Sequence, residues 1–385
     1  MAPAEFNKRK ILLVTNDLGP RSGGIETFIL GLLAKLDGSE VVIYTSAQDG
    51  SADFDADLVK RFGVVICRDR TKILLPSPRV TRQVKSVLRN YGCETVWFGA
   101  AAPLGLMAPA LRRAGAKRVV GLTHGHEVWW AKVPFFNLAL RRIGNSSDVL
   151  TYLGEFTKSA IAKAVGKRVE LTQIAPGIST NFFTPGAKSE ALLKKYELSS
   201  GPTLICVGRL VHRKGQDKLI LAMPEILKSI PNAQLLIVGS GPREAHLRKL
   251  IANLNLSSSV KLSGRVTYND LPAHIRLGDV FAMPSRSRFF GLEVEGLGIV
   301  YLEASSCGLP VIAGNSGGAP DAVSINETGL VVDGTNTGEI AEACIKLLAD
   351  PKLSKELGAN GRRWAVTNWN WDLWGSRFAQ VLKGN

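Results

Sequence analysis

Cysteine is scarce and scattered in this chain. The 385 residues contain five cysteines, an odd number with no C-x-x-C pair: Cys67, Cys93, Cys206, Cys307 and Cys344. This usage argues against a disulfide framework and gives no support to a structural zinc site. We therefore expect a protein of a reducing compartment.

The chain also lacks a long apolar run. The uncharged residues 95–111 number only 17 and are interrupted by Gly and Pro, too few for a helix that spans a bilayer. The basic residues 8–10 precede a strand-like run that soon reaches Asn16 and Asp17, which is not the pattern of a signal peptide. The sequence predicts a cytoplasmic protein, attached at most to a membrane surface.

Several nucleotide-binding and metal-binding motifs are missing. The glycine-rich loop at residues 16–27 contains neither a Walker A motif nor G-x-G-x-x-G, so it predicts neither a P-loop nor a dinucleotide site. His124, His126 and Glu127 lack the i, i+4 spacing of a helical zinc site, and no D-x-D element lies in a plausible site. We expect no cofactor and no essential metal ion.

Negative charge is in the minority. The chain has 48 Lys and Arg against 33 Asp and Glu, a formal net charge of +15. The excess is concentrated in residues 79–142, which hold eleven basic and two acidic residues. Such a bias informs about partners rather than about the fold. Nucleic acid, an anionic membrane and a phosphorylated substrate all remain candidates.

Short apolar strands alternate with helical segments in two series. The first series comprises residues 10–15, 40–44, 64–67, 95–98, 118–122 and 149–152, and the second comprises residues 203–208, 234–238, 260–262, 280–283, 311–313 and 329–332. This alternation predicts parallel sheets with helices on both faces. Together with the length, it predicts two α/β domains, residues 1–185 and 186–365, and a Trp-rich helix over residues 364–382.

The most informative segment carries two glutamates eight positions apart. Glu295 precedes a glycine-rich turn, and Glu303 lies on the short helix that the turn opens. Free N–H groups at the start of that helix, near Gly298 and Ile299, attract phosphate, and a carboxylate beside them can accept hydrogen bonds from sugar hydroxyls. The combination suggests a site for a sugar joined to a phosphate. The alternative is a pair of surface glutamates at an ordinary turn.

Two cations follow the first strand of the second series. Arg209 and Lys214 are five positions apart in a loop between a strand and a helix. That loop lies at the carboxyl end of a parallel sheet, where ligands bind. Arg can hold a phosphate bidentately, and Lys acts as a point charge. The pair therefore predicts a diphosphate site, with solvated loop cations as the alternative.

Two loops of the first series carry further candidates. Gly23 and Gly24 would let the backbone approach a ligand closely, although a plain tight turn is the alternative. His124 and His126 follow the strand at residues 118–122. Either ring could face a ligand, and His126 could equally be a structural residue.

Taken in their order along the chain, these motifs resemble those of family GT4, the retaining glycosyltransferases with the GT-B fold. The resemblance rests on the E-x7-E element, the Arg209 and Lys214 loop, Gly-Gly-x-Glu after the first strand and the His124 loop. It covers nearly the whole chain and is strongest over residues 201–333. It implies two Rossmann-like domains that face across a cleft, with residues 366–385 forming a helix that crosses back to the first domain.

The resemblance also implies roles for particular residues. Arg209 and Lys214 would neutralise the donor diphosphate. Glu303 would bind the ribose and Glu295 the hydroxyls of the transferred sugar, while His124 would contact that sugar. These roles make His124, Arg209, Lys214 and Glu295 the expected catalytic residues. The other expected donor-binding positions are Gly23, Gly24, Gly241, Val266, Gly298 and Ile299, with the nucleobase held by backbone groups around Val266.

Within the family, the His124 loop and the basic segment at residues 79–89 resemble the actinobacterial phosphatidylinositol mannosyltransferases. This resemblance implies GDP-mannose as the donor and a phosphatidylinositol monomannoside, mannosylated in α-1,6 linkage, as the inositol phospholipid acceptor. In the front-face reaction of such enzymes, a donor phosphate oxygen takes the acceptor proton. The alternative is another nucleotide sugar with a soluble or different lipid acceptor.

The basic segment predicts attachment to an anionic membrane, at the inner face of the cell membrane. Arg79, Arg82, Lys85 and Arg89 would share one face of a helix, opposite an apolar face, which suits anionic lipid headgroups. A solvated basic face is the alternative.

Two other classes of protein would account for some of these features. A nucleic-acid-binding protein would explain the charge, but no recognition-helix or RNA-binding pattern is evident. A phosphorylase or sugar-nucleotide epimerase of the GT-B fold would explain the domains, but no pyridoxal lysine segment is identifiable for a phosphorylase. We expect neither a nucleic acid nor a protein partner.

Overall fold

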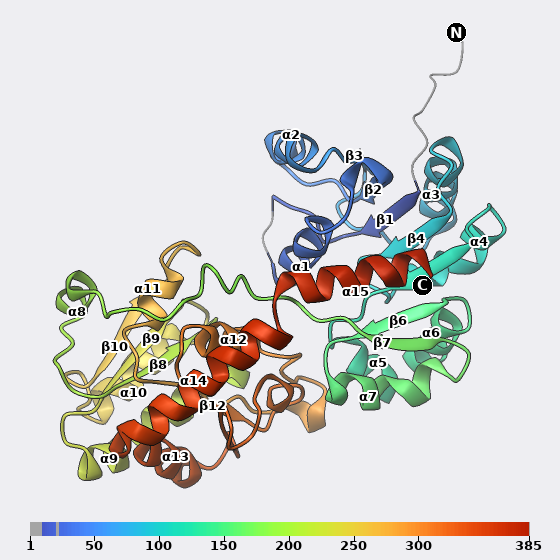
Figure 1. The fold of residues 1–385 in the computed structure, drawn as a ribbon. Coiled ribbons are helices and arrows are strands. Elements are labelled where there is room, and N and C mark those ends of the chain that lie inside the picture. Colours follow the sequence, from blue (N-terminus) through green and yellow to red (C-terminus); the bar gives the residue numbers. More distant parts are fainter. Residues whose placement is uncertain (1–9, 21–22, 385) are drawn as a thin grey trace. The chain divides into compact units, whose positions relative to one another are not determined.

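The computed structural model describes residues 10–20 and 23–384, which form two compact units (Figure 1). Unit 1 combines residues up to Gly177 with the segment from Trp371 onwards, and unit 2 runs from Ile178 to Asn370. These divisions differ from the predicted boundaries after residues 185 and 365. Arg21 and Ser22 of the first glycine-rich loop lie outside the described residues.

Residues 178–185 belong to unit 2 because their backbone is bonded to it. Ile178 forms an isolated bridge with Asn370. Phe183 is buried, and its carbonyl accepts hydrogen bonds from Arg362 Nη1 at 2.8 Å and Ser306 Oγ at 2.7 Å. Such contacts with distant residues leave no mark in the composition of the segment.

Unit 1 is a seven-stranded, fully parallel sheet in the order β3-β2-β1-β4-β5-β6-β7. The strands are β1 (Ile11–Thr15), β2 (Val41–Thr45), β3 (Val65–Arg68), β4 (Thr95–Phe98), β5 (Arg118–Gly121), β6 (Val149–Tyr152) and β7 (Glu170–Gln173). The α-helices before the last are α1 (Gly24–Leu33), α2 (Ser51–Phe62), α3 (Pro78–Asn90), α4 (Ala108–Arg112), α5 (Glu127–Lys132), α6 (Pro134–Gly144) and α7 (Glu155–Val165). The strands β1 and β2 are buried along their whole length because helices cover both faces of the sheet.

The seventh strand has no counterpart among the predicted strands. β7 reads Glu-Leu-Thr-Gln and lies at the edge of the sheet, partly exposed. An edge strand with three polar residues lacks the apolar run from which the other strands were predicted.

The predicted single helix over residues 364–382 is wrong. The structure has two helices there, α14 (Pro351–Asn368) in unit 2 and α15 (Trp371–Lys383) in unit 1. In unit 1, α15 lies beside α1 (Figure 1). Phe378 is fully buried with its ring 4.8 Å from that of Trp97. The Trp371 indole covers Gly31, where a Cβ would come within 2.1 Å of it.

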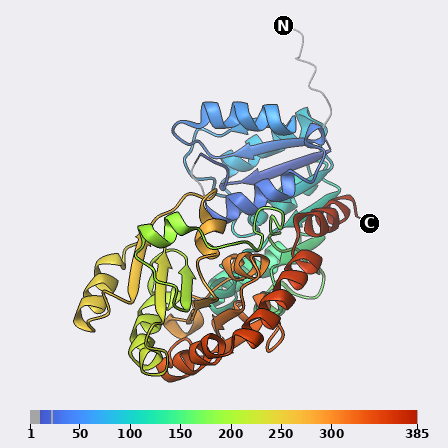
Figure 2. The ribbon, with the colours of Figure 1, turned by 60° about the vertical axis from the view of Figure 1, so that its left-hand side comes forward.

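Unit 2 is a six-stranded parallel sheet in the order β10-β9-β8-β11-β12-β13. The strands are β8 (Thr203–Val207), β9 (Gln234–Val238), β10 (Val260–Gly264), β11 (Val280–Met283), β12 (Val311–Gly314) and β13 (Gly329–Val332). Apart from α14, the α-helices are α8 (Glu190–Lys195), α9 (Gln216–Ser229), α10 (Glu244–Asn253), α11 (Leu271–Ile275), α12 (Ile299–Ser306) and α13 (Thr337–Ala349). The helices α13 and α14 pack side by side in this unit (Figure 2).

Each sheet has one point at which the strand order reverses. In unit 1 the chain runs outward from β1 through β2 and β3 and then returns to β4 on the other side of β1. In unit 2 it runs outward from β8 through β9 and β10 and returns to β11. Ligands of doubly wound sheets bind at the carboxyl ends of the strands at such points.

Candidate active site

The loops at the carboxyl ends of β8, β9 and β10 are packed closely in unit 2. Gly208 N–H donates to the carbonyl of Val238 at 2.9 Å, and Leu210 N–H donates to that of Ser240 at 3.0 Å. Gly241 lies against this layer, where a Cβ would come within 2.5 Å of the Leu210 carbonyl oxygen. Close packing between loops therefore explains glycine at position 241 without a ligand.

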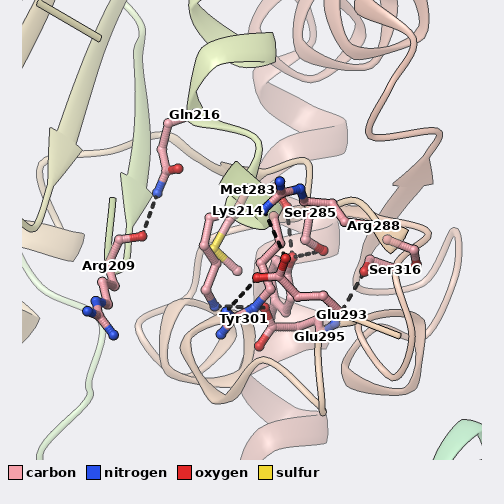
Figure 3. Close-up of polar contacts among 12 residues, drawn as sticks. Arg209, Lys214, Gln216, Met283, Ser285, Arg288, Glu293, Glu295, Tyr301 and Ser316 are labelled. Atoms are coloured by element: carbon pink, nitrogen blue, oxygen red, sulfur yellow. Dashed lines mark hydrogen bonds and ion pairs between the residues drawn. The ribbon is translucent and has the colours of Figure 1, made fainter. Parts of the chain in front are cut away.

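The structure brings two predicted site residues into direct contact. Lys214, in the 3₁₀ turn η3 (His212–Lys214), places Nζ 2.9 Å from Oε2 of Glu295 (Figure 3). The two side chains are only 11% and 9% exposed. Because a buried charge is costly without a partner, each of these groups balances the other.

Arg209 lies apart from this ion pair. Its carbonyl accepts a hydrogen bond from Gln216 Nε2 at 3.2 Å, but its side chain is directed away from the carboxylates (Figure 3). The residue is exposed, and its guanidinium has no ion-pair partner among residues 10–20 and 23–384. A cation held this way is available to an incoming anion.

The segment around Glu295 is held by backbone contacts. Its N–H donates to Ser316 Oγ at 3.2 Å, and its carbonyl accepts from Gly318 N–H at 2.8 Å. Gly298 caps α12 with a φ of +81°, so the left-handed region favours glycine there. The helix then begins at Ile299. The predicted turn-to-helix arrangement at residues 295–303 is present.

Glu303 lies on α12 and is buried, with 8% of its surface exposed. Burial raises the pKa of its carboxyl to about 7, although the charge of Lys214 acts in the opposite direction. A buried carboxyl whose pKa lies near neutrality is typical of a functional site. Val266, by contrast, is half-buried in the loop after β10 and is involved in none of these contacts.

Sequence reasoning missed a group of charged residues around Glu295. Arg288 Nη1 donates to Glu293 Oε2 at 3.0 Å, and Arg213 Nη1 lies 3.5 Å from Glu293 Oε1. Arg213 Nε is also 3.7 Å from Glu295 Oε2. Two of these residues are close in sequence to predicted site residues, since Arg213 precedes Lys214 and Glu293 shortly precedes Glu295, but nothing in the sequence shows that Arg213 reaches Glu293 and Glu295.

In unit 1, His124 follows β5 and is fixed on two sides. Its backbone N–H donates to Glu127 Oε2 at 3.0 Å, and its Nε2 lies 2.6 Å from the carbonyl oxygen of Gly99. A carbonyl oxygen only accepts, so Nε2 carries the proton and Nδ1 the lone pair. Burial lowers the pKa of His124, with the charge of Glu127 acting in the opposite direction. The neutral ring thus offers an acceptor at Nδ1.

His126 is held more loosely. Its Nε2 lies 3.2 Å from Glu127 Oε1 and 3.4 Å from the carbonyl oxygen of Ala102. Its ring stacks on that of His124 at 6.2 Å. His124 is therefore held more firmly than His126.

The first glycine-rich loop ends at the start of α1. Gly23 N–H donates to Glu26 Oε2 at 3.0 Å, and Glu26 is buried. Gly23 and Gly24 are both exposed, and a Cβ at either position would meet nothing within 4 Å. Packing among the described residues therefore does not explain the two glycines.

The basic helix α3 differs from the prediction at one residue. Val80, Val84 and Leu88 are buried as an apolar face. Arg79, however, donates through Nη1 and Nη2 to both oxygens of Asp69, at 3.0 and 2.8 Å. Its charge is balanced by this pair, which contact between distant segments creates and spacing along the helix could not reveal.

Among the described residues there is no group of three or more His, Cys, Asp or Glu side chains that could hold a metal ion. None of the described helices is both long enough and apolar enough to cross a bilayer.

Two Rossmann-like units with these loops at their switch points define a glycosyltransferase of the GT-B fold, and the chain belongs to glycosyltransferase family 4. Residues 22–182 match the family described as Glycosyltransferase Family 4, and residues 189–364 match the family described as Glycosyl transferases group 1. The protein is therefore an enzyme that transfers glycosyl groups.

Curated relatives match the chain over nearly its full length. It is 44% identical over 376 residues, 97% of this chain and 98% of the relative, to the GDP-mannose-dependent α-(1-6)-phosphatidylinositol monomannoside mannosyltransferase of Mycolicibacterium smegmatis. It is 41% identical over 378 residues, again 97% and 98%, to the GDP-mannose-dependent monoacylated α-(1-6)-phosphatidylinositol monomannoside mannosyltransferase of Corynebacterium glutamicum.

Solved structures share the fold at low sequence identity. Sucrose-phosphate synthase from Thermosynechococcus elongatus superposes with a TM-score of 0.79 at 23% identity, covering 98% of this chain and 99% of the other. Anabaena HepE in complex with UDP superposes with a TM-score of 0.80 at 20% identity, covering 98% and 100%. At this identity the likeness establishes the fold alone.

Proposed function

We propose that the protein transfers mannose from GDP-mannose to a phosphatidylinositol monomannoside and forms an α-(1-6) linkage. The observation that carries the proposal is the 41–44% identity, over 97–98% of the chain, to curated relatives with that named activity. The charged loops of unit 2 supply chemistry suited to such a donor.

In this proposal the donor is bound mainly by unit 2. Arg209 and Lys214 contact the diphosphate, with N–H groups near Gly298 and Ile299 as further donors. Glu303 accepts hydrogen bonds from the ribose hydroxyls, and backbone groups near Val266 hold the guanine. Positive charge at the diphosphate stabilises the leaving group as negative charge develops on it.

Two side chains are assigned to the transferred sugar in this proposal. Glu295 accepts hydrogen bonds from mannose hydroxyls, and His124 offers its Nδ1 lone pair to another. The acceptor hydroxyl attacks the anomeric carbon on the face that GDP leaves, and a donor phosphate oxygen takes its proton. The configuration is retained, and no protein general base is needed.

The lipid acceptor requires that the enzyme work at a membrane surface. Three basic residues of α3, Arg82, Lys85 and Arg89, have no ion-pair partner among the described residues. On α6, Phe135 and Leu138 are 77% and 70% exposed. Cations attract anionic headgroups, and exposed apolar side chains enter the interface. We propose peripheral attachment through unit 1, at the inner face of the cell membrane.

The test is a transfer assay with matched donors and acceptors. Purified enzyme is incubated with GDP-mannose, GDP-glucose, UDP-glucose or ADP-glucose, and with phosphatidylinositol monomannoside, phosphatidylinositol or free inositol phosphate. We expect mannose transfer from GDP-mannose to the monomannoside, and NMR of the product should show an α-1,6 linkage. Efficient transfer from a UDP-sugar, or to a soluble acceptor only, would contradict the proposal.

A further inference from the structure

A buried arginine lies beside the loop that carries Arg209 and Lys214 and has no part in the proposed donor site. Arg286 follows β11 and is 5% exposed. Its Nη1 and Nη2 donate to Oδ1 and Oδ2 of Asp217 at 2.9 and 2.8 Å. Nη2 also lies 2.7 Å from Nδ1 of His212. The backbone N–H of Arg286 donates to the Arg213 carbonyl at 2.8 Å. Arg286 thus ties η3 to the first turn of α9.

These contacts fix the protonation state of His212. A guanidinium has donors and no acceptor, so Nδ1 must carry a lone pair and Nε2 the proton. Burial and the charge of Arg286 lower the pKa of His212, Asp217 opposes them, and Arg288 and Arg243 act in the lowering direction. A neutral ring follows from the geometry and from the surrounding charges alike.

The Arg286 cation is itself balanced within this cluster. Burial alone would raise the pKa of Asp217, but the hydrogen bonds and charge of Arg286 lower it below its usual range. The bidentate geometry keeps both carboxylate oxygens satisfied. Arg286 therefore does not lie free as a phosphate-binding cation, unlike the exposed Arg209.

We propose that Arg286, paired with Asp217, is a positioning residue that keeps the His212 ring neutral and holds the loop carrying Lys214 in its ligand-binding conformation. The inference rests on the proposed function, in which this loop binds the donor diphosphate. Removing both charges would remove the Arg286 donor at Nδ1, so His212 would take up a proton more readily than in the wild type, although burial and the charges of Arg288 and Arg243 would still lower its pKa. A cation would then appear next to Lys214.

The test uses the full-length enzyme with the neutral, hydrogen-bonding pair Arg286→Gln/Asp217→Asn, which leaves no unpaired buried charge. GDP affinity is measured by calorimetry between about pH 5.5 and 7.5 and expressed relative to wild type at each pH. This ratio cancels the titration of GDP and of Glu303. We expect it to be below one at the upper pH and to rise several-fold as the pH falls.

The control adds His212→Asn to the same double variant. The rise at low pH should then disappear, whereas Arg286→Lys alone should keep the ratio nearly constant because it retains the charge. A pH-independent ratio in Arg286→Gln/Asp217→Asn, or a rise that persists without His212, would overturn the inference. A loop that is merely destabilised would weaken binding equally at every pH.

A second measurement does not depend on donor binding. NMR of the histidine Cε1–H groups, with His212 assigned through His212→Asn, should show His212 titrating at a lower pH in the wild type than in Arg286→Gln/Asp217→Asn. The same titration midpoint in both proteins would refute the proposed positioning role. If wild type binds no GDP but the NMR result holds, the proposed function fails and the charge assignment stands.

Discussion

At the scale of single residues, Arg209 and Lys214 differ in what each holds before a ligand arrives. Arg209 is exposed, whereas Lys214 balances the buried carboxylate of Glu295 at 2.9 Å. In the proposed function, a diphosphate bound by Lys214 would therefore draw it away from Glu295 or share it. The same step would free Glu295 for sugar hydroxyls, so the two proposed contacts with the donor would be linked.

Removing either cation should reduce transfer by about 100-fold or more, because loss of one contact to developing charge typically costs about 3 kcal/mol. Only Lys214→Ala should also lower the melting temperature, since it leaves Glu295 buried without its cation. Steady-state kinetics and thermal unfolding of Arg209→Ala and Lys214→Ala measure both effects. Arg248→Ala, an exposed cation on α10, is the matched control. Wild-type turnover in both site variants would rule out the diphosphate role.

Glu303 should make nucleotide binding depend on pH. Its pKa is raised to about 7, and only the ionised carboxylate accepts from both ribose hydroxyls. GDP affinity should therefore fall as the pH drops below 7, by at most about tenfold per pH unit from this group. Calorimetry with wild type and Glu303→Gln isolates the contribution, because the titration of GDP is common to both. An identical pH dependence of GDP affinity in the two proteins would refute this contribution of Glu303. The variant Glu295→Gln should retain GDP affinity.

The same pKa has a consequence for stability with a definite sign. A carboxyl whose pKa is raised on folding binds a proton more tightly in the native state than in the unfolded chain. Its contribution is therefore greatest below its ordinary pKa and is lost as the pH rises through about 7. The melting temperature of the wild type should fall over this pH range by more than that of Glu303→Gln.

At the scale of elements, α3 should contribute to membrane binding through three residues. The triple variant Arg82→Ala/Lys85→Ala/Arg89→Ala should greatly reduce sedimentation with phosphatidylinositol-containing vesicles, since each cation contributes about 1 kcal/mol at an anionic surface. The effect should shrink as salt screens it. The matched control removes Lys163, Lys167 and Arg168, exposed cations in and after α7. Equal sedimentation of both triple variants would show that the basic face of α3 is only solvated and does not bind the membrane.

Arg79 requires separate treatment from the other basic residues of α3. Because Arg79 pairs with the buried Asp69, its replacement by Ala should destabilise unit 1 rather than only weaken vesicle binding. Including it in a charge-removal variant would confuse the two effects.

The helix α15 should be essential for the stability of unit 1. Phe378→Ala removes a fully buried ring that packs against Trp97, and such a truncation typically costs about 3–5 kcal/mol. Denaturant unfolding followed by Trp fluorescence should show the loss. Ser376→Ala, at an exposed position on the same helix, should change stability little. A comparable loss in both variants would contradict the role of the buried ring.

At the scale of the whole molecule, the enzyme should retain substantial activity in EDTA. The reason is that Arg209 and Lys214 supply positive charge where the diphosphate is expected to bind. Mannose transfer with and without EDTA, followed by addition of Mg²⁺, is the measurement. Complete loss that Mg²⁺ restores would show that the two cations do not suffice.

Much of the architecture could be predicted from local pattern. The buried parallel strands declare themselves as short apolar runs, and the glycine-rich turns after them mark the carboxyl edges of the sheets. The E-x7-E segment forms the predicted turn and helix, with Gly298 at its cap. The edge strand β7 escaped because an edge position does not require an apolar sequence.

The amino-acid sequence by itself determined the class of fold, the family and the loops in which the site residues lie, because burial and turn formation leave periodic and local signals. Only the tertiary structure decided which charges meet. The partners in Lys214–Glu295, Arg79–Asp69 and Arg286–Asp217 are brought together by strand order and loop packing. Spacing along the chain cannot reveal such pairs, since a Coulomb interaction depends on distance in space.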